Sequence, residues 1–251
     1  MKFYRWFLLM PALGWFLFSA PDSITRLAQG EKKPTLTAAV ESIIGLTNQF
    51  RREPGRRQVK VNPQLTTTAQ QFADFMARTD KFGHTADGSR PADRAKAHGY
   101  DYCVIAENIA YQYNSAGFST EALAKGFVEG WENSPEHQKN MLDSAVTETG
   151  VAIARSRQTG TYYAVQLFGR PRADLITFQV ANQSQAQIQY RTDGKSWSLP
   201  PRYTRTHGQC RPDELIIQWP DGRKSTPIRP DNSARYVIRT GKSEALELKK
   251  E

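Results

Sequence analysis

The sequence predicts an α+β fold over about residues 36–170, followed by a small antiparallel β-sandwich over residues 175–251. Two observations lead to this prediction. In the first half, apolar residues recur at intervals of three and four, which is typical of amphipathic helices. Further along, short alternating runs are separated by Gly, Pro, Asn and Asp, which is typical of antiparallel strands. Helices first and strands later, joined by short connections, indicate an α+β sandwich.

The helices of the first part have recognisable starts and ends. An apolar stripe runs through residues 36–50 and ends before Pro54-Gly55. Asn62-Pro63 predicts the start of a second helix, because proline is favoured at the first helical position. A third, short helix is expected over residues 92–97. Thr120 is expected to cap a fourth helix that ends at Asn133.

Ser134-Pro135-Glu136 predicts the start of a last short helix, with the serine side chain as its cap. This places His137 in the first turn, beside backbone N–H groups that have no partner within the helix. A histidine there is able to face a cleft. By composition alone, a surface or capping role is the more common one.

Strands are expected after this helix. Residues 150–155 and 162–168 alternate around the Thr159-Gly160 turn and predict a hairpin. Beyond residue 175, strand candidates lie at residues 175–180, 186–190, 215–219 and 235–238. The charged tail, residues 242–251, is expected to fray. The aromatic residues of this module suit either a sugar-stacking surface or, more commonly, a core: Trp197, Tyr203, Trp219 and Tyr236.

The N-terminus predicts export. Lys2 and Arg5 precede an apolar run over residues 6–20, and Ala28-Gln29-Gly30 offers small residues for signal cleavage. We therefore expect a signal peptide over residues 1–30 and a linker over residues 31–37, with an uncleaved short anchor as the alternative. The mature protein is expected to be secreted, periplasmic or attached to the cell envelope, to have no transmembrane span and to be a monomer.

The charge balance favours anionic partners. The formal net charge is +9 over the chain and +7 over residues 31–251. Such a surface favours contact with cell-envelope lipid or polysaccharide. The basic residues are scattered, so a role in solubility alone fits equally well, and no nucleic-acid motif accompanies them.

Cys103 and Cys210 are the two cysteines of the chain and stand 107 positions apart. In an exported protein they are able to form one disulfide that ties the two halves together. Two unrelated free thiols are the other possibility that the sequence leaves open.

Several short motifs occur in order along the first part. They are Asn48-x-x-Arg51, Gly83-His84-Thr85 before Asp87-Gly88, Ala106-Glu107-Asn108-Ile109-Ala110, Trp131-x-x-Ser134-x-x-His137-x-x-Asn140, and Gly150-Val151. Each is weak alone, but the ordered set is specific. Residues 38–170 thereby resemble the bacterial branch of the CAP superfamily, or SCP domains, which includes cysteine-rich secretory proteins, antigen 5 and pathogenesis-related proteins.

The resemblance implies an α-β-α sandwich with a central cleft lined by two histidines and acidic residues. Carried over by position, the histidines are His84 and His137 and the first acid is Glu107. The second acid of many eukaryotic members is replaced here by Ser134, as is common in bacterial relatives. Any mechanism that needs two carboxylates is therefore in doubt. Ser134, Asn108 and Asn140 are the further polar residues expected to bind a ligand.

Three chemistries suit this trio. His84 and His137 are candidate ligands of a divalent metal such as zinc, with Glu107 as a third group and an open position for water. Alternatively, Glu107 orients one imidazole as a general base without a metal. The third possibility is a buried polar network that fixes the loops. Ser134 has the position of a cap rather than of a catalytic nucleophile.

Two functions follow from these chemistries. The first is a noncatalytic ligand-binding module of the cell envelope or the extracellular space. The alternative is a divalent-metal-assisted, peptidase-like hydrolase that uses His84, His137 and Glu107. Members of the superfamily are associated with several activities, so the fold does not decide between them.

Overall fold

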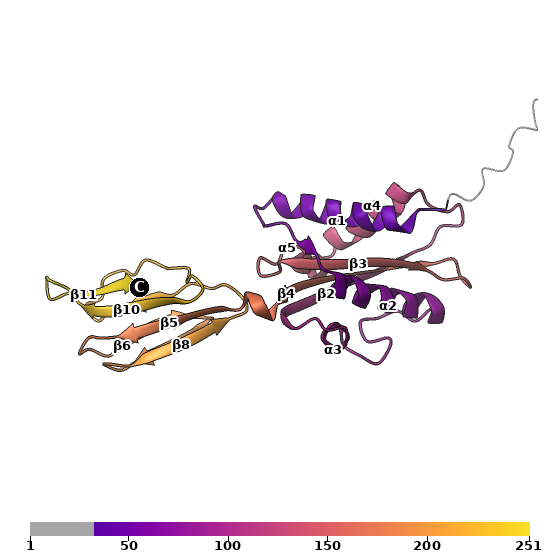
Figure 1. Cartoon of the computed structure of the whole chain (residues 1–251). Coiled ribbons are helices and arrows are strands. Elements are labelled where there is room, and N and C mark those ends of the chain that lie inside the picture. The colour runs from indigo at the N-terminus through magenta and orange to yellow at the C-terminus, as the bar shows by residue number, and fades with distance from the viewer. Residues whose placement is uncertain (1–32) are drawn as a thin grey trace, which may run out of the picture.

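The computed structural model describes residues 33–251, and the predicted signal peptide and part of the predicted linker lie outside this range. The molecule is elongated and consists of a helix-and-sheet domain and a C-terminal β module (Figure 1). The first domain has five helices among the described residues. These are α1 (Leu36–Arg52), α2 (Pro63–Thr79), α3 (Pro91–Ala97), α4 (Thr120–Glu132) and α5 (Pro135–Leu142).

A four-stranded sheet forms the middle layer of this domain. Its strands lie in the order β1 (Lys60–Val61), β3 (Glu148–Arg155), β4 (Tyr162–Pro171) and β2 (Tyr102–Gln112). β1 pairs in parallel with the first residues of β3, and the other pairings are antiparallel. β2 is thus an edge strand of this sheet.

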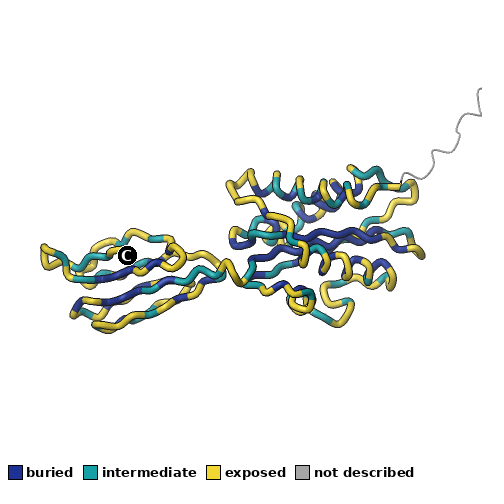
Figure 2. The backbone as a smooth tube through the Cα atoms, in the orientation of Figure 1, coloured by how far each residue is buried: buried dark blue, intermediate teal, exposed yellow. Residues whose placement is uncertain are grey.

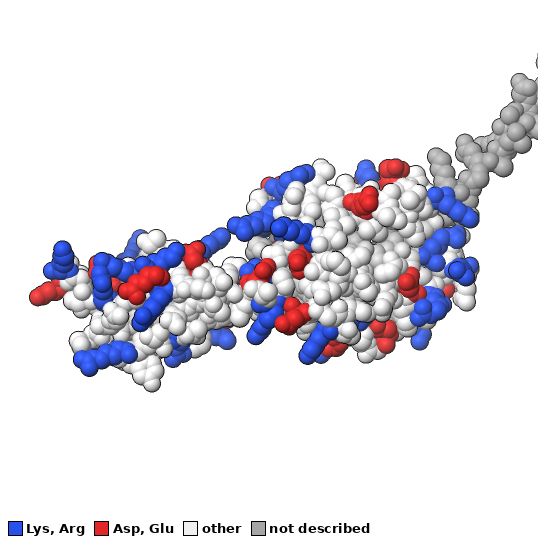
Figure 3. All heavy atoms as spheres, viewed as in Figure 1, with Lys and Arg blue, Asp and Glu red and all other residues white. Residues whose placement is uncertain are grey.

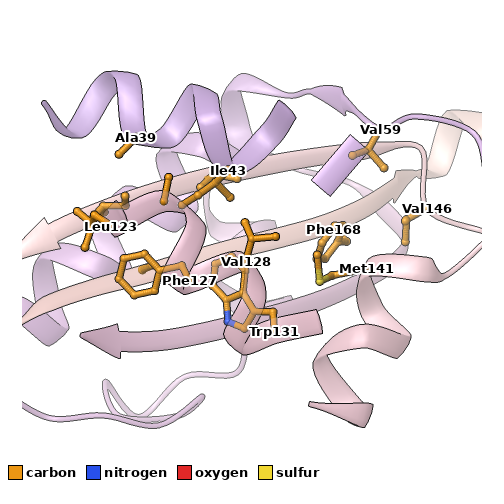
Figure 4. Close-up of a cluster of buried hydrophobic side chains, with 14 of the residues drawn as sticks. Ala39, Ile43, Val59, Leu123, Phe127, Val128, Trp131, Met141, Val146 and Phe168 are labelled. Atoms are coloured by element: carbon orange, nitrogen blue, oxygen red, sulfur yellow. The ribbon is translucent and has the colours of Figure 1, made fainter. Parts of the chain in front are cut away.

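Helices cover both faces of the sheet, as Figure 1 shows: α1 and α4 lie on one face and α2 and α3 on the other. On the α1/α4 side, a core of buried side chains includes Ile43, Phe127 and Trp131 (Figure 4). On the other side, Leu65, Phe72 and further residues of α2 pack against the opposite face of the strands. The predicted α-β-α sandwich is confirmed, because α1 and α4 bury apolar residues on one face of the sheet and α2 buries an apolar stripe on the other.

Gly150 explains the closing Gly150-Val151 motif. A Cβ atom built on Gly150 would lie 2.2 Å from the backbone carbonyl carbon of Leu65 and 2.3 Å from the backbone nitrogen of Thr66. The first turn of α2 therefore packs directly on the backbone of β3. Only glycine leaves room for this approach.

The predicted helix caps differ in outcome. α2 starts at Asn62-Pro63, as expected, and the Asn62 side chain caps it by accepting hydrogen bonds from the backbone N–H groups of Gln64 and Leu65. The prediction that Thr120 caps α4 is wrong by one residue. Ser119 Oγ accepts from Ala122 N at 3.1 Å, and Thr120 Oγ1 instead accepts from the backbone N–H of Thr35 at 3.0 Å.

The side-chain cap expected of Ser134 is not formed. Ser134 occupies the N-cap position of α5, but its hydroxyl makes no cap hydrogen bond. Pro135 has no N–H to offer and its ring fixes the backbone for the first turn. The turn is closed by the backbone bond from Gln138 N–H to the Ser134 carbonyl, at 2.8 Å.

The C-terminal module contains two sheets packed on a common core. One sheet has the order β11 (Leu246–Lys250), β10 (Ala234–Thr240), β5 (Ile176–Asn182) and β8 (Thr204–Gln209). The other has the order β7 (Lys195–Leu199), β6 (Ile188–Thr192) and β9 (Ile216–Gln218). Buried and exposed residues alternate strictly along β6, as expected of a strand with one face on the core and one in solvent, whereas β5 and β10 each have three consecutive buried residues (Figure 2).

Two details of the module differ from the sequence-based expectation. β5 and β10 pair in parallel, whereas the other strand pairs of the module are antiparallel. The tail expected to fray is strand β11, which pairs with β10 from Tyr236–Lys250 to Thr240–Leu246. Leu246 and Leu248 of this strand pack against the core, which outweighs the charge of the segment.

The aromatic residues of the module are mainly structural. Tyr236 is buried, and Trp197 and Trp219 pack against the module core. Tyr203 is 62% exposed and alone of the four stays largely in solvent. The core role is therefore the better description of this set.

The two parts of the chain are joined covalently beyond the polypeptide itself. Cys103 in β2 forms a disulfide with Cys210, just after β8, with a Cα–Cα distance of 5.1 Å. Beside it, Arg211 Nη1 donates to Asp143 Oδ2 at 2.6 Å. Of the two possibilities left open for the cysteines, the structure has the disulfide.

Candidate functional site

The site lies at the outer edge of β2, where α3, α5 and the loop after α2 meet. Glu107 is in the middle of β2, and its side chain is 1% exposed. Its Oε1 atom lies 2.8 Å from Nδ1 of His84, which is on the loop before α3. The imidazole of His84 is 49% exposed, so it covers the buried carboxylate and faces solvent on its other side.

Arg94 completes this group and was not predicted from the sequence. Its Nη2 donates to Glu107 Oε2 at 2.7 Å and to the His84 carbonyl at 3.1 Å. Its Nη1 donates to Asp87 Oδ1 at 3.0 Å and to the Ser89 carbonyl at 2.8 Å. The guanidinium also lies over the ring of Phe72, 3.5 Å from its centroid. One buried arginine thus holds the entire His84 loop against Glu107.

Both carboxylate oxygens of Glu107 are therefore engaged, one by His84 and one by Arg94. A carboxylate that acts as a general base on water needs an oxygen within hydrogen-bond reach of that water. In this geometry Glu107 orients His84 instead. The same bond fixes Nδ1 of His84 as the ring nitrogen that faces Glu107 and leaves Nε2 outside this contact, on a half-exposed side chain.

His137 approaches from the opposite side of β2, on α5. Its backbone carbonyl accepts from Asn108 Nδ2 at 3.1 Å, which ties the first turn of α5 to the strand. Its imidazole makes no hydrogen bond within residues 33–251. Burial, with a smaller effect from the neighbouring His84, lowers the pKa of His137 below its usual value. The ring is therefore neutral at pH 7 and keeps a lone pair available for a ligand.

Asn140 has a positioning role at the same edge. Its Nδ2 donates to Asn108 Oδ1 at 2.9 Å and to the Glu107 carbonyl at 3.3 Å. Two residues further along β2, the Ile109 carbonyl accepts from Trp131 Nε1 at 3.3 Å. These side chains satisfy alternate carbonyls of the edge strand, which would otherwise be open to pairing with another chain. Asn108 is itself fully buried, so it contributes to the site from within.

The Asn48-x-x-Arg51 motif supports the site from a distance. Arg51 is completely buried and donates to the backbone carbonyls of Arg57, Met141 and Asp143, at the end of α5 and in the loop after α1. Asn48 pairs with both backbone groups of Val59. The motif therefore fixes the helix that carries His137.

Of the predicted residues, the structure brings together His84, Glu107, Asn108, His137 and Asn140. Ser134 is partly exposed at the start of α5 and forms no hydrogen bond with His137. Arg94 was missed because a single arginine in a seven-residue helix looks like any solvated charge. In the sequence, the apolar neighbour Ala95 is a weak indication that this turn faces inward, and in the structure Ala95 is indeed 0% exposed.

The residues fit a three-ligand metal site poorly. Among residues 33–251, no group of three or more His, Cys, Asp or Glu side chains is arranged to hold a metal ion. Glu107 is occupied by Arg94 and His84, so only the two imidazoles remain as protein donors. A tight zinc site normally has three or four protein ligands. The zinc site predicted from the sequence stays a prediction.

The first domain is thus a three-layer sandwich with two histidines and an acid at the edge of its sheet. Residues 44–168 match the family described as CAP, the cysteine-rich secretory protein family. The chain therefore carries a CAP domain, as the ordered motifs predicted.

Two proteins of Bacillus subtilis strain 168 are similar in sequence. The uncharacterized protein YkwD is 28% identical over 152 residues, which is 57% of this chain and 54% of YkwD. The uncharacterized membrane protein YlbC is 29% identical over 132 residues, which is 52% of this chain and 36% of YlbC. This chain thus matches about half of one relative and about a third of the other.

Solved structures with similarity include two bacterial proteins. An outer surface protein from Borrelia burgdorferi has a TM-score of 0.47 and 16% identity, over 53% of this chain and 93% of that protein. An extracellular protein containing a SCP domain from Bacillus anthracis has a TM-score of 0.46 and 24% identity, over 54% of this chain and 41% of that protein.

No helix within residues 33–251 is both long and apolar enough to cross a membrane.

Proposed function

We propose that this protein is an exported, noncatalytic module that binds an anionic lipid or polysaccharide of the cell envelope through the cleft at the edge of β2. The observation that carries the proposal is the double engagement of Glu107. With one oxygen on His84 and the other on Arg94, the carboxylate holds the cleft together rather than activating water. The imidazole of His84 is 49% exposed, and His137 is partly exposed, so both imidazoles suit hydrogen bonding to a ligand.

Export is supported by the N-terminal sequence and by the Cys103–Cys210 disulfide, because disulfides persist in oxidising compartments. The positive charge of the chain favours an anionic ligand. The sequence relatives support no particular ligand.

The test is a binding assay with purified protein whose disulfide is intact. Wild type, His84→Ala and His137→Ala are compared for binding to anionic phospholipid vesicles and to a soluble anionic polysaccharide at two salt concentrations. We expect wild type to bind one of the two, more weakly at higher salt, and both variants to lose at least about fivefold in affinity. If His84→Ala and His137→Ala both bind as tightly as wild type, the cleft is rejected as the binding site.

The hydrolase alternative predicts a different result. It requires zinc binding that depends on both histidines, together with turnover that a chelator and His137→Ala abolish. Zinc titration by calorimetry on the same three proteins decides between them. Zinc affinity tighter than about micromolar, lost in both variants, would support the alternative and count against the proposal.

A further inference from the structure

Exposed aromatic side chains gather at one end of the domain, beside the cleft. Among residues 33–251, the large apolar side chains that stay exposed include Phe82 at 46%, Tyr111 at 59% and Tyr113 at 62%. Phe82 and Tyr111 are in edge-to-face contact, with ring centroids 4.9 Å apart. An exposed aromatic cluster of this kind has no role in the core and commonly marks a binding surface.

The cluster has a rigid floor. Tyr163 lies directly opposite Tyr111 in the β2–β4 pair and is 5% exposed, with its ring 6.3 Å from Tyr111 and 6.5 Å from Phe82. Its hydroxyl donates to Asp80 Oδ1 at 3.1 Å. Asp80 also accepts from the hydroxyl groups of Ser156 and Thr159, so the end of α2 is fixed to the β3–β4 turn. The rings above this floor are therefore preorganised, which lowers the entropic cost of binding.

The platform formed by Phe82, Tyr111 and Tyr113 continues into the cleft. Phe82 stands two residues before His84 on the same loop. Tyr111 stands four residues after Glu107 in β2, so both side chains lie on the same face of the strand, about 13 Å apart along it. A chain-like ligand with one unit at His84 therefore places its next units on Phe82 and Tyr111.

The rim of the platform is basic. Lys81 precedes Phe82, and Arg155 lies at the end of β3, with its guanidinium 5.6 Å from the centroid of the Tyr162 ring; both residues are exposed. An ideal Cβ on Gly160 would lie 3.0 Å from the Arg155 guanidinium and 3.7 Å from the ring of Tyr113, so this cation and this ring flank the same turn. Figure 3 shows Lys and Arg atoms gathered at the end of the domain where the β3–β4 turn lies in Figure 1.

We propose that Phe82, Tyr111 and Tyr113 form a subsite for an anionic polysaccharide built of pyranose rings, next to the His84 cleft. The C–H face of a pyranose is weakly positive and matches the negative face of an aromatic ring. The tyrosine hydroxyls offer hydrogen bonds to sugar hydroxyls, and the basic rim complements sugar carboxylates. The rings stand on a strand and a tethered loop rather than on a protruding tip, which suits a glycan better than insertion into a membrane.

This inference rests on the proposed function and selects the polysaccharide among its two ligand classes. The probe is an oligogalacturonate of about six units, measured by calorimetry against the disulfide-intact protein. Phe82→Ala and Tyr111→Ala are each expected to weaken binding at least about fivefold, with Tyr111→Phe retaining most of it. Tyr203→Ala, an equally exposed tyrosine in the C-terminal module, is the matched control and is expected to leave binding unchanged.

Two further probes separate stacking from charge and from lipid. Polyaspartate carries carboxylates without pyranose rings, and we expect Tyr111→Ala to leave its weak binding unchanged. Equal effects of Tyr111→Ala on both polymers, or none on the oligogalacturonate, would overturn the subsite. The subsite would also be overturned if Tyr111→Ala weakened binding to anionic vesicles alone. In that case the proposed cleft would still stand if His84→Ala reduced the same vesicle binding. Absence of binding to every probe by wild type would reject both proposals.

Discussion

The ion pair between Arg94 and Glu107 makes a quantitative prediction about stability. The two charged groups are 2.7 Å apart, and their side chains are 7% and 1% exposed. Two unit charges about 4 Å apart interact by about 4 kcal/mol at an effective dielectric constant of about 20. Breaking a buried pair by removing one partner typically costs about 3–5 kcal/mol, because the other charge is left uncompensated.

We therefore expect Arg94→Met to lower the free energy of unfolding by about 3–5 kcal/mol. The methionine keeps an apolar side chain over Phe72, so most of the loss comes from the polar contacts. Glu107→Gln is expected to cost less, about 2–4 kcal/mol, because the amide retains hydrogen-bonding capacity. In the double variant neither charge of the Arg94–Glu107 pair is left uncompensated, so the combined loss should be smaller than the sum by at least about 2 kcal/mol. Asp87 loses its Arg94 partner in both Arg94→Met variants, so that contribution is the same in each.

The assay is urea unfolding, followed by tryptophan fluorescence and by far-UV circular dichroism so that agreement of the two probes can be checked. Arg90→Met is the matched control, because the Arg90–Asp93 pair lies one turn away with side chains 75% and 49% exposed. No measurable change is expected there. An Arg94→Met variant as stable as the control, or losses that simply add in the double variant, would refute the reasoning.

Three further predictions follow from the fold. Gly150→Ala should lower the free energy of unfolding by about 1–3 kcal/mol in urea unfolding, because the added Cβ collides with the α2 backbone. Gly45→Ala is the control; its Cβ meets open space, so this variant should be neutral or slightly stabilised. Replacing both Cys103 and Cys210 by serine should cost about 2–5 kcal/mol, and a reducing agent should then destabilise wild type but not the variant. Burial, with a smaller effect from Arg205, lowers the pKa of His207 in the folded protein. The unfolded state therefore binds this proton more tightly, and the free energy of unfolding falls as the pH drops below about 6.5. In urea unfolding at several pH values, His207→Gln should reduce this dependence of stability on pH.

Most of the fold was predictable from local sequence patterns. The start of α2 at Asn62-Pro63 and the apolar stripe of α1 depend on residues within one or two turns of each other, so the sequence displays them directly. Strand β11 was missed because its charged residues suggested solvation, although Leu246 and Leu248 already alternate. The parallel pairing of β5 with β10 joins residues more than fifty positions apart, and no local pattern indicates it.

The candidate site was predictable only in part. His84, Glu107 and His137 were found through the ordered motifs. Arg94 was not, because its role depends on the path of the loop over residues 82–90, which returns a short helix to the buried face of β2. The aromatic platform was missed for the same reason. Phe82 and Tyr111 are 29 positions apart and come together through the tertiary fold, in which Asp80 ties the end of α2 to the β3–β4 turn.

The geometry separates the motif residues that hold the scaffold from the two histidines of the candidate site. Trp131 and Asn140 stand nine positions apart and reach the carbonyls of Ile109 and Glu107, two residues apart on the edge strand. Together with the Asn108 bond to the α5 backbone, these contacts fasten α4 and α5 to β2. Replacing any of them changes stability and the cleft at once, so loss of binding in such a variant would not identify a ligand contact. The ring of His84 is exposed and His137 is partly buried, and a substitution at either position removes an imidazole while these scaffold contacts remain; at His84 it also removes the hydrogen bond to Glu107.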